Sequence, residues 1–177
     1  YRNLINPGGL QGYEGILGDA AFAANVQNDF YRGLACDGST PYGNWNASNH
    51  VVFTYDPATG MLKSQVDANP SYCMEYNIGD LGDLNYIQLD VVNRAAGTTV
   101  NFMNVTLNGE PLPDLVGTGW STWQVTGLDL TSGFTIAGDL ELAWPTPAAT
   151  SGQETNKLKI SVGYLTPPPS VELVPAS

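Results

Sequence analysis

The chain has 177 residues, enough for one domain that buries about 70% of its unfolded surface, and 42% of its residues are hydrophobic. Only 13% are charged, against about a quarter in an average soluble protein. The net charge of −11 disfavours contact with nucleic-acid phosphates and with anionic lipid, so neither is an expected partner. No stretch approaches the roughly 18 apolar residues of a membrane span.

The composition favours an exported protein. Lys and Arg together number six, and the chain starts at Tyr1 without a charged segment followed by an apolar run. We therefore expect an extracellular or cell-surface location, with a signal peptide already removed. The two cysteines, Cys36 and Cys73, predict one disulfide that would contribute about 3–4 kcal/mol in the chain-entropy treatment. Two buried free thiols are the alternative. One His and no CxxC spacing make a zinc site unexpected.

The chain opens with a Gly-rich segment without hydrophobic periodicity, Tyr1–Gly18, which we expect to be an extended arm. After Asp19, a candidate N-cap, apolar residues recur every four positions. This spacing predicts a short helix over residues 20–31, with a strand as the alternative. The end of the chain, residues 166–177, is a Pro-rich tail that favours an extended polyproline conformation.

Between these ends, alternation of apolar and polar residues predicts strands. The clearest case is residues 134–144, where Phe134, Ile136 and Leu140 alternate with Asp139 and Glu141. The predicted strands span residues 51–55, 61–66, 72–78, 85–93, 100–107, 120–125, 134–144 and 158–162. The first two form a hairpin, because residues 56–60 are a turn-forming Asp-Pro-Ala-Thr-Gly sequence.

The phase of the alternation changes inside the strand predicted over residues 100–107. Val100 and Phe102 occupy even positions, whereas Val105 and Leu107 occupy odd ones. One extra residue at Met103–Asn104, a β-bulge, would keep all four side chains in the core. The pattern as a whole predicts an all-β fold: an antiparallel, jelly-roll-like β-sandwich of about eight strands over residues 19–165.

Three consecutive phrases carry a resemblance. They are FMNVTLNG at residues 102–109, GWSTWQVTGLDL at residues 119–130 and SGFTIAG at residues 132–138. The segment of residues 85–162 that contains them resembles the C-terminal half of the "choice-of-anchor" domains, which precede PEP-CTERM sorting tails in exported bacterial proteins. The resemblance implies a β-sandwich protein of the cell surface and matrix, and it supplies no catalytic residues.

The sequence offers little catalytic machinery, so we expect no enzyme. The lone His50 begins a strand, no GxSxG motif accompanies it, and we interpret it as an edge residue. Asp139 and Glu141 lie about 6.6 Å apart by strand rise, which glycoside hydrolysis would tolerate. Their face is opposite the core, however, where acidic residues are expected for solubility.

A structural calcium ion is the one cofactor that the sequence suggests. Asp80, Asp83 and Asn85 bring three oxygen donors into a Gly-containing loop, and calcium takes carboxylate and amide oxygens. The spacing is not that of an EF-hand. A plain solvated turn is the alternative.

Three tryptophans are candidates for sugar binding, because flat aromatic rings stack on sugar faces while neighbouring amides bond to hydroxyl groups. Trp45 lies in a Tyr-Gly-Asn-Trp-Asn loop. Trp120 and Trp123 are three positions apart and face opposite sides of a strand, so one should be in the core and the other exposed. The alternative is that all the tryptophans are packing residues.

These observations lead to two functional hypotheses. The first is a non-enzymatic structural protein that forms a homo-oligomer or polymer, as a fibre or layer. Its terminal arms, residues 1–18 and 166–177, would add strands to the open sheet edges of neighbouring copies. The alternative is a carbohydrate-binding module whose partner is a polysaccharide.

Overall fold

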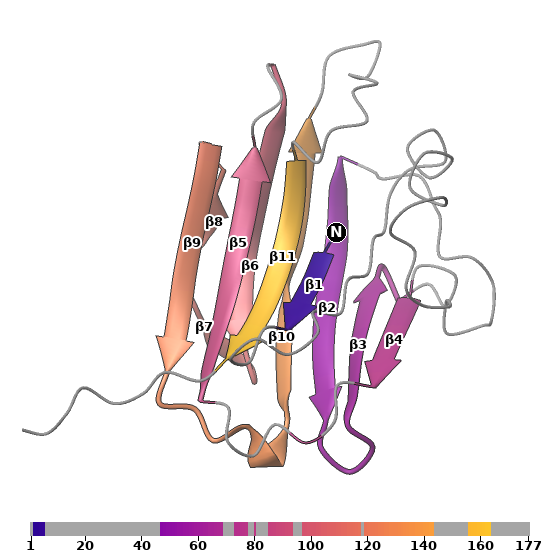
Figure 1. Ribbon diagram of the computed structural model, residues 1–177. Helices are drawn as coiled ribbons and strands as arrows, with labels where there is room; N and C mark the ends of the chain where they lie inside the picture. The colour runs from indigo at the N-terminus through magenta and orange to yellow at the C-terminus, as the bar shows by residue number, and fades with distance from the viewer. Residues whose placement is uncertain are drawn as a thin grey trace, which may run out of the picture.

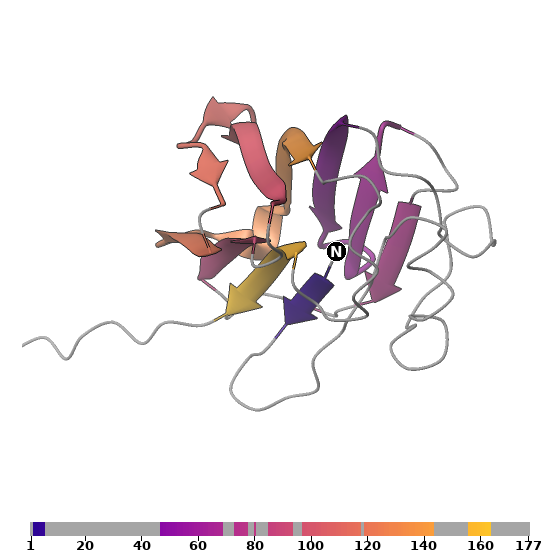
Figure 2. The ribbon, with the colours of Figure 1, turned by 90° about the horizontal axis from the view of Figure 1, so that it is seen from above.

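The computed structural model describes residues 2–5, 47–68, 73–77, 80, 85–93, 97–117, 119–143 and 156–163, and these residues form two facing β-sheets (Figures 1 and 2). The four-stranded sheet has the order β1 (Arg2–Ile5), β11 (Asn156–Gly163), β5 (Tyr86–Asn93) and β9 (Gly119–Thr126). The seven-stranded sheet has the order β4 (Cys73–Asn77), β3 (Met61–Val66), β2 (Ser48–Asp56), β10 (Phe134–Ala143), β6 (Thr99–Leu107) and β7 (Glu110–Pro111), and β8 (Leu115–Val116) also pairs with β6.

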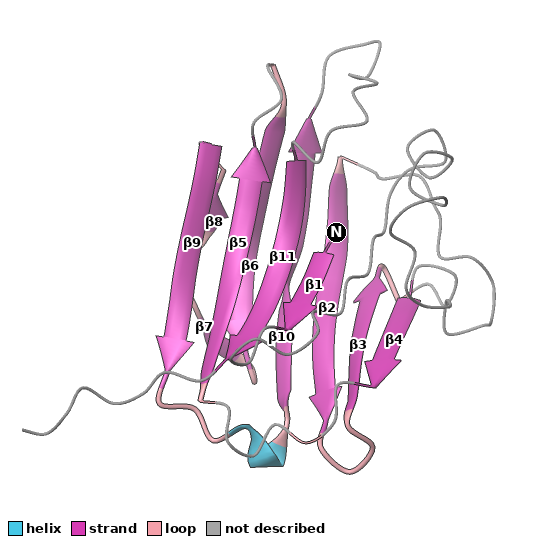
Figure 3. Cartoon of the chain, in the orientation of Figure 1, coloured by secondary structure: helices cyan, strands magenta, loops and turns pink. Residues whose placement is uncertain are grey.

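The predicted all-β sandwich is confirmed. Each of the eight predicted strands is present within one to three residues of its expected bounds, and β1, β7 and β8 are additional. In the part of the chain that the structure describes, the only helical element is the single 3-10 turn η2 (Leu130–Ser132), shown in cyan in Figure 3. The helix predicted over residues 20–31 lies outside the described residues.

The order of the strands has jelly-roll character. From β5 through β6, β9 and β10 to β11, each long strand lies in the opposite sheet from the one before it. All pairings among the described strands are antiparallel except one: β1 runs parallel to β11.

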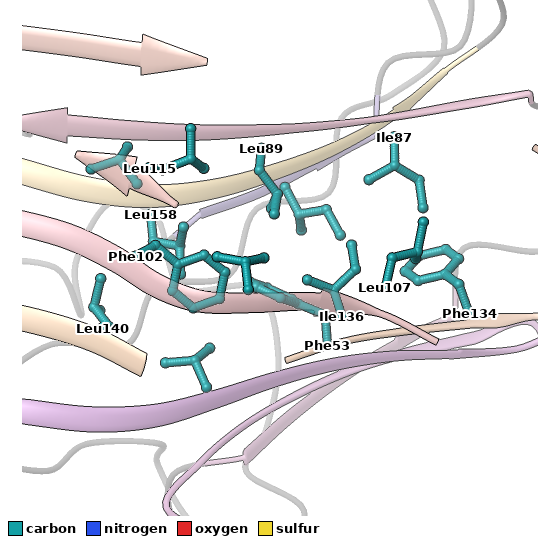
Figure 4. Packing of buried hydrophobic residues seen from close by; sticks show 14 of the residues in the cluster. Phe53, Ile87, Leu89, Phe102, Leu107, Leu115, Phe134, Ile136, Leu140 and Leu158 are labelled. Atoms are coloured by element: carbon teal, nitrogen blue, oxygen red, sulfur yellow. The ribbon is translucent and has the colours of Figure 1, made fainter. Parts of the chain in front are cut away.

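The core fills the space between the two sheets (Figure 4). Alternation dictates which residues enter it, since every second side chain of a strand points to the same face. In β10, Phe134, Ile136 and Leu140 are buried, and the aliphatic residues Ile87 and Leu89 of β5 meet them from the other sheet. Each such side chain contributes about 1.5–3 kcal/mol when it is fully buried.

The predicted β-bulge is confirmed in β6. Asp139 pairs with Met103 and Ala137 pairs with Thr106, so two residues of β6 oppose one residue of β10. Asn104 takes up the extra position with a φ of +53°, a left-handed conformation that Asn tolerates better than most residues. Val100, Phe102, Val105 and Leu107 are consequently all buried.

A buried glycine leads the chain from one sheet to the other. Gly117 follows β8 at the edge of the seven-stranded sheet and precedes β9 of the four-stranded sheet. A Cβ atom at this position would lie 2.2 Å from the carbonyl oxygen of Val100, so only glycine fits. The amide of Gly117 donates a hydrogen bond to that same carbonyl oxygen, at 3.1 Å. This close approach holds the chain against β6 at the point where it leaves the seven-stranded sheet.

Candidate functional site

The four-stranded sheet has two unlike edges (Figure 1). At one edge, the four residues of β1 lie beside β11, with Arg2 opposite Lys159 and Leu4 opposite Ser161. Parallel pairing is slightly less stable per residue than antiparallel pairing, and four residues form few bonds. The part of the predicted arm that the structure describes is therefore a short strand on the outside of the sheet.

The other edge is β9, which is eight residues long. It pairs with β5 on one side, and no described strand pairs with its other side. Long edge strands present unpaired main-chain groups to which another chain can add. Trp120 near the start of β9 and Val116 in β8 are the large apolar side chains most exposed in the described part of the chain, at 48% and 52%.

A buried carboxylate lies at the centre of the outer face of this sheet, the face that points away from the core. Asp90 of β5 has no exposed surface. It accepts hydrogen bonds from the Gln88 amide, at 2.8 and 3.0 Å, from the Trp120 indole N–H at 3.1 Å, and from the Thr122 hydroxyl. The ammonium group of Lys159 on β11 lies 3.3 Å away. One side chain thus connects strands β5, β9 and β11.

The Asp90 carboxylate is held in its charged form. Burial alone would raise the pKa of this carboxyl, but the three hydrogen-bond donors and the nearby ammonium group outweigh burial and lower the pKa. A buried charge is costly unless it is paired and hydrogen-bonded, and both conditions are met here. The cluster therefore ties three strands of the sheet together.

The two tryptophans of β9 face opposite sides of the sheet, as predicted. Trp123 packs against the core, and its indole nitrogen is buried without a hydrogen-bond partner. Trp120 lies on the outer face, where its N–H donates to Asp90 and to the Thr122 hydroxyl oxygen at 2.9 Å. Further along the same face of β9, the Gln124 amide donates to Gln88 at 2.6 Å. Of the two tryptophans of β9, Trp120 is the one presented at the surface.

A second polar cluster lies on the outer face of the seven-stranded sheet. The Nδ1 atom of His50 lies 2.9 Å from one oxygen of Asp139, and the Asn104 amide donates to the other oxygen at 2.9 Å. These hydrogen bonds, that of His50 first, lower the pKa of the Asp139 carboxyl. The interpretation of His50 as an edge residue is wrong, because β2 lies between β3 and β10 inside the sheet.

The disulfide prediction lies partly within the described residues. Cys73, the first residue of β4, is fully buried and disulfide-bonded. Cys36 lies outside the described residues, so its pairing with Cys73 stays a prediction.

The predicted calcium loop and the third tryptophan are described only in part. Asp80 is exposed and Asn85 is half-buried, with its carbonyl oxygen accepting a hydrogen bond from Leu128 at 3.1 Å. Asp83 and Trp45 lie outside the described residues. Within the described ranges, no three His, Cys, Asp or Glu side chains are grouped so as to hold a metal ion. The calcium site and the role of Trp45 stay predictions.

No protein-family model matches the chain, and no curated protein matches it. A functional proposal therefore has to rest on the chain's own residues. None of the described helices is long and apolar enough to span a membrane. The outer face and the two edges of the four-stranded sheet are therefore the features on which a functional proposal has to rest.

Proposed function

We propose that this chain is a non-enzymatic structural protein of the cell surface or extracellular matrix whose copies assemble through the edges of the four-stranded sheet. The observation that carries the proposal is β1: the four residues Arg2–Ile5 lie as a strand on the sheet edge. Their pairing with β11 uses main-chain hydrogen bonds that any copy of the chain can supply. The exported location rests on the low content of charged residues and on the resemblance to choice-of-anchor domains.

The open edge of β9 supports the same proposal from the other side of the sheet. A closed barrel has no edges, whereas this sandwich leaves an eight-residue strand without a described partner beyond it. The acidic surface is compatible with assembly, since main-chain bonding along an edge needs no charged partner. Assembly of an acidic subunit should strengthen with ionic strength, because salt screens the repulsion between copies.

The test compares the full chain with a variant that lacks residues 1–5, by negative-stain electron microscopy and light scattering. We expect ordered polymers from the full chain and their loss on removal of β1. Leu4→Pro, which keeps the chain length, is the second variant, and circular dichroism establishes that both variants fold. Monodisperse monomers from the full chain at all concentrations would contradict the proposal.

Trp120 favours a second candidate function, binding of a polysaccharide to the outer face of the four-stranded sheet. Trp120 is 48% exposed, and its indole N–H is fixed by Asp90 and Thr122. Gln124, which donates to Gln88, lies on the same face of β9 four positions further along, beyond Thr122. Trp120→Ala should abolish retention on an insoluble polysaccharide, whereas Val116→Ala, a similarly exposed apolar position, should leave it unchanged. Equal retention of both variants would exclude this role for Trp120.

A further inference from the structure

We propose, on the basis of the proposed function, that the strand completing the β11 edge in the assembly is β1 of a second copy. Arg2–Ile5 of one copy would then pair in parallel with residues 159–162 of the next, in the register that the structure shows within one chain. The partner is thus a second copy of this chain, and the joint is an exchanged β1 strand.

The first reason is that no short turn joins β1 to the sheet on which it lies. The hairpin of β2 and β3 is closed by a short turn, in which the amide of Gly60 donates to Asp56 at 2.8 Å. By contrast, residues 6–47 separate β1 from β2. Parallel strands cannot be joined by a tight turn, so no local connection commits β1 to the β11 of its own chain.

The second reason is that β1 pairs with one strand, β11, among those that the structure describes. The N–H and C=O groups of a second copy's β1 can make the same bonds in the same register. β1 can therefore pair with the β11 of its own chain or with that of a second copy. Which pairing dominates depends on the protein concentration relative to the effective concentration of β1 within one chain. Exchange of an identical element between copies is a low-cost route to assembly.

The third reason is charge. The strand β1 carries one cation, Arg2, whereas the chain as a whole has a net charge of −11. A cation on β1 offsets part of the repulsion between two acidic copies at the joint. The residue opposite Arg2 in the register is Lys159, and the charge of Lys159 is already compensated by Asp90 at 3.3 Å. The like charge on the accepting strand is thereby offset.

The geometry also predicts the kind of assembly. The donor, β1, and the acceptor, β11, are different surfaces of the chain, so each copy gives one strand and receives one. Such a head-to-tail contact forms a ring where the rotation closes and an open filament where it does not. Both β1 and β11 lie in the four-stranded sheet, where they are neighbours (Figure 2). Exchange of β1 between copies keeps this pairing and its register.

The experiment uses two full-length chains with one added cysteine each, mixed before assembly and treated with a short thiol-reactive crosslinker that leaves disulfides intact. Leu4→Cys is combined with Ser161→Cys, its register partner. Two controls are combined with the same donor: Asn156→Cys at the far end of β11, and Gln124→Cys on β9. Ile5→Cys with Val162→Cys is a second register pair, available where the first folds poorly.

We expect a crosslinked product of two-chain mass in the polymer fraction for position 161, and only background for positions 156 and 124. Polymers whose crosslink occurs at position 124, or in which a Leu4→Cys/Ser161→Cys double variant crosslinks only within single chains, would overturn the inference and leave the proposed function standing. Absence of polymers from the parent chain would instead overturn the proposed function itself.

Discussion

Asp90 and Asp139 occupy comparable positions in the two sheets. Each lies in the middle of a sheet, points away from the core and has a pKa lowered by the hydrogen bonds that it accepts. They differ in burial: the side chain of Asp90 has no exposed surface, whereas that of Asp139 is 36% exposed. Solvent screens the second cluster and not the first. Similar hydrogen-bond partners should therefore have very unequal energetic effects, which substitutions can measure.

The largest effect should come from Asp90→Ala. This change leaves Lys159, whose side chain is only 18% exposed, without its anion, and it removes the acceptor shared by Trp120 and Gln88. Removing one partner of a buried pair costs about 3–5 kcal/mol, so we expect the free energy of unfolding to fall by about 3 kcal/mol. Urea denaturation measures it. A loss below about 1 kcal/mol, the size of a surface pair, would show that the cluster behaves as a solvated one.

A smaller effect should follow from Lys159→Met, which keeps the length of the side chain and removes its charge. The Asp90 carboxylate then retains its hydrogen bonds but loses the one nearby cation. We expect a loss of about 1–2 kcal/mol, because the three donors still satisfy the anion. The double variant Asp90→Ala/Lys159→Met completes a cycle. A coupling energy near zero would contradict direct pairing of the two charges.

The features that the sequence could predict are those that depend on contacts within one strand. The strand predicted over residues 85–93 is confirmed, with Ile87, Leu89 and Val91 buried, and the phase change at Met103–Asn104 correctly predicted the bulge. Both predictions depend on neighbours along the chain. Asp90 lies between these apolar residues, and no pattern within its own strand indicates that it is completely buried.

The burial of Asp90 depends on pairing between distant strands. Trp120 and Thr122 of β9 reach it from about thirty positions along the chain, and Lys159 reaches it from β11. Alternation cannot give the register that brings these strands together. The strand β1 could not be predicted, for a related reason. Residues 1–18 have no hydrophobic period, and β1 pairs through main-chain groups, which carry no sequence signal.

Acid should reduce the contribution of the Asp90 cluster to the free energy of unfolding, and so bring it closer to that of the Asp139 cluster. The folded-state pKa of Asp90 lies below its unfolded value of about 3.9, so its stabilising contribution is present above about pH 4 and lost as the pH falls through the folded pKa. We expect the unfolding free energies of the parent chain and Asp90→Asn to converge between pH 5 and pH 2, approximately. Asp139 is present in both proteins and cancels from the comparison. A constant gap over this range would show that the carboxylate charge is not the stabilising feature.

The smallest effect should come from Asp139→Ala. The His50 ring is 55% exposed, and water replaces the lost carboxylate for both His50 and Asn104. Exposed pairs contribute about 0.2–1 kcal/mol, so the free energy of unfolding should fall by no more than about 1 kcal/mol. The loss should shrink further in high salt, whereas the loss caused by Asp90→Ala should change little, because buried pairs are screened less. Equal salt dependence of the two variants would show that exposure does not separate the two clusters.

The bulge at Asn104 gives an internal check on the Asp139→Ala variant. The main-chain N–H of Asn104 donates to Asp114 at 2.7 Å, independently of Asp139. A cost above about 2 kcal/mol would therefore mean that Asp139, rather than Asp114, holds the bulge in place.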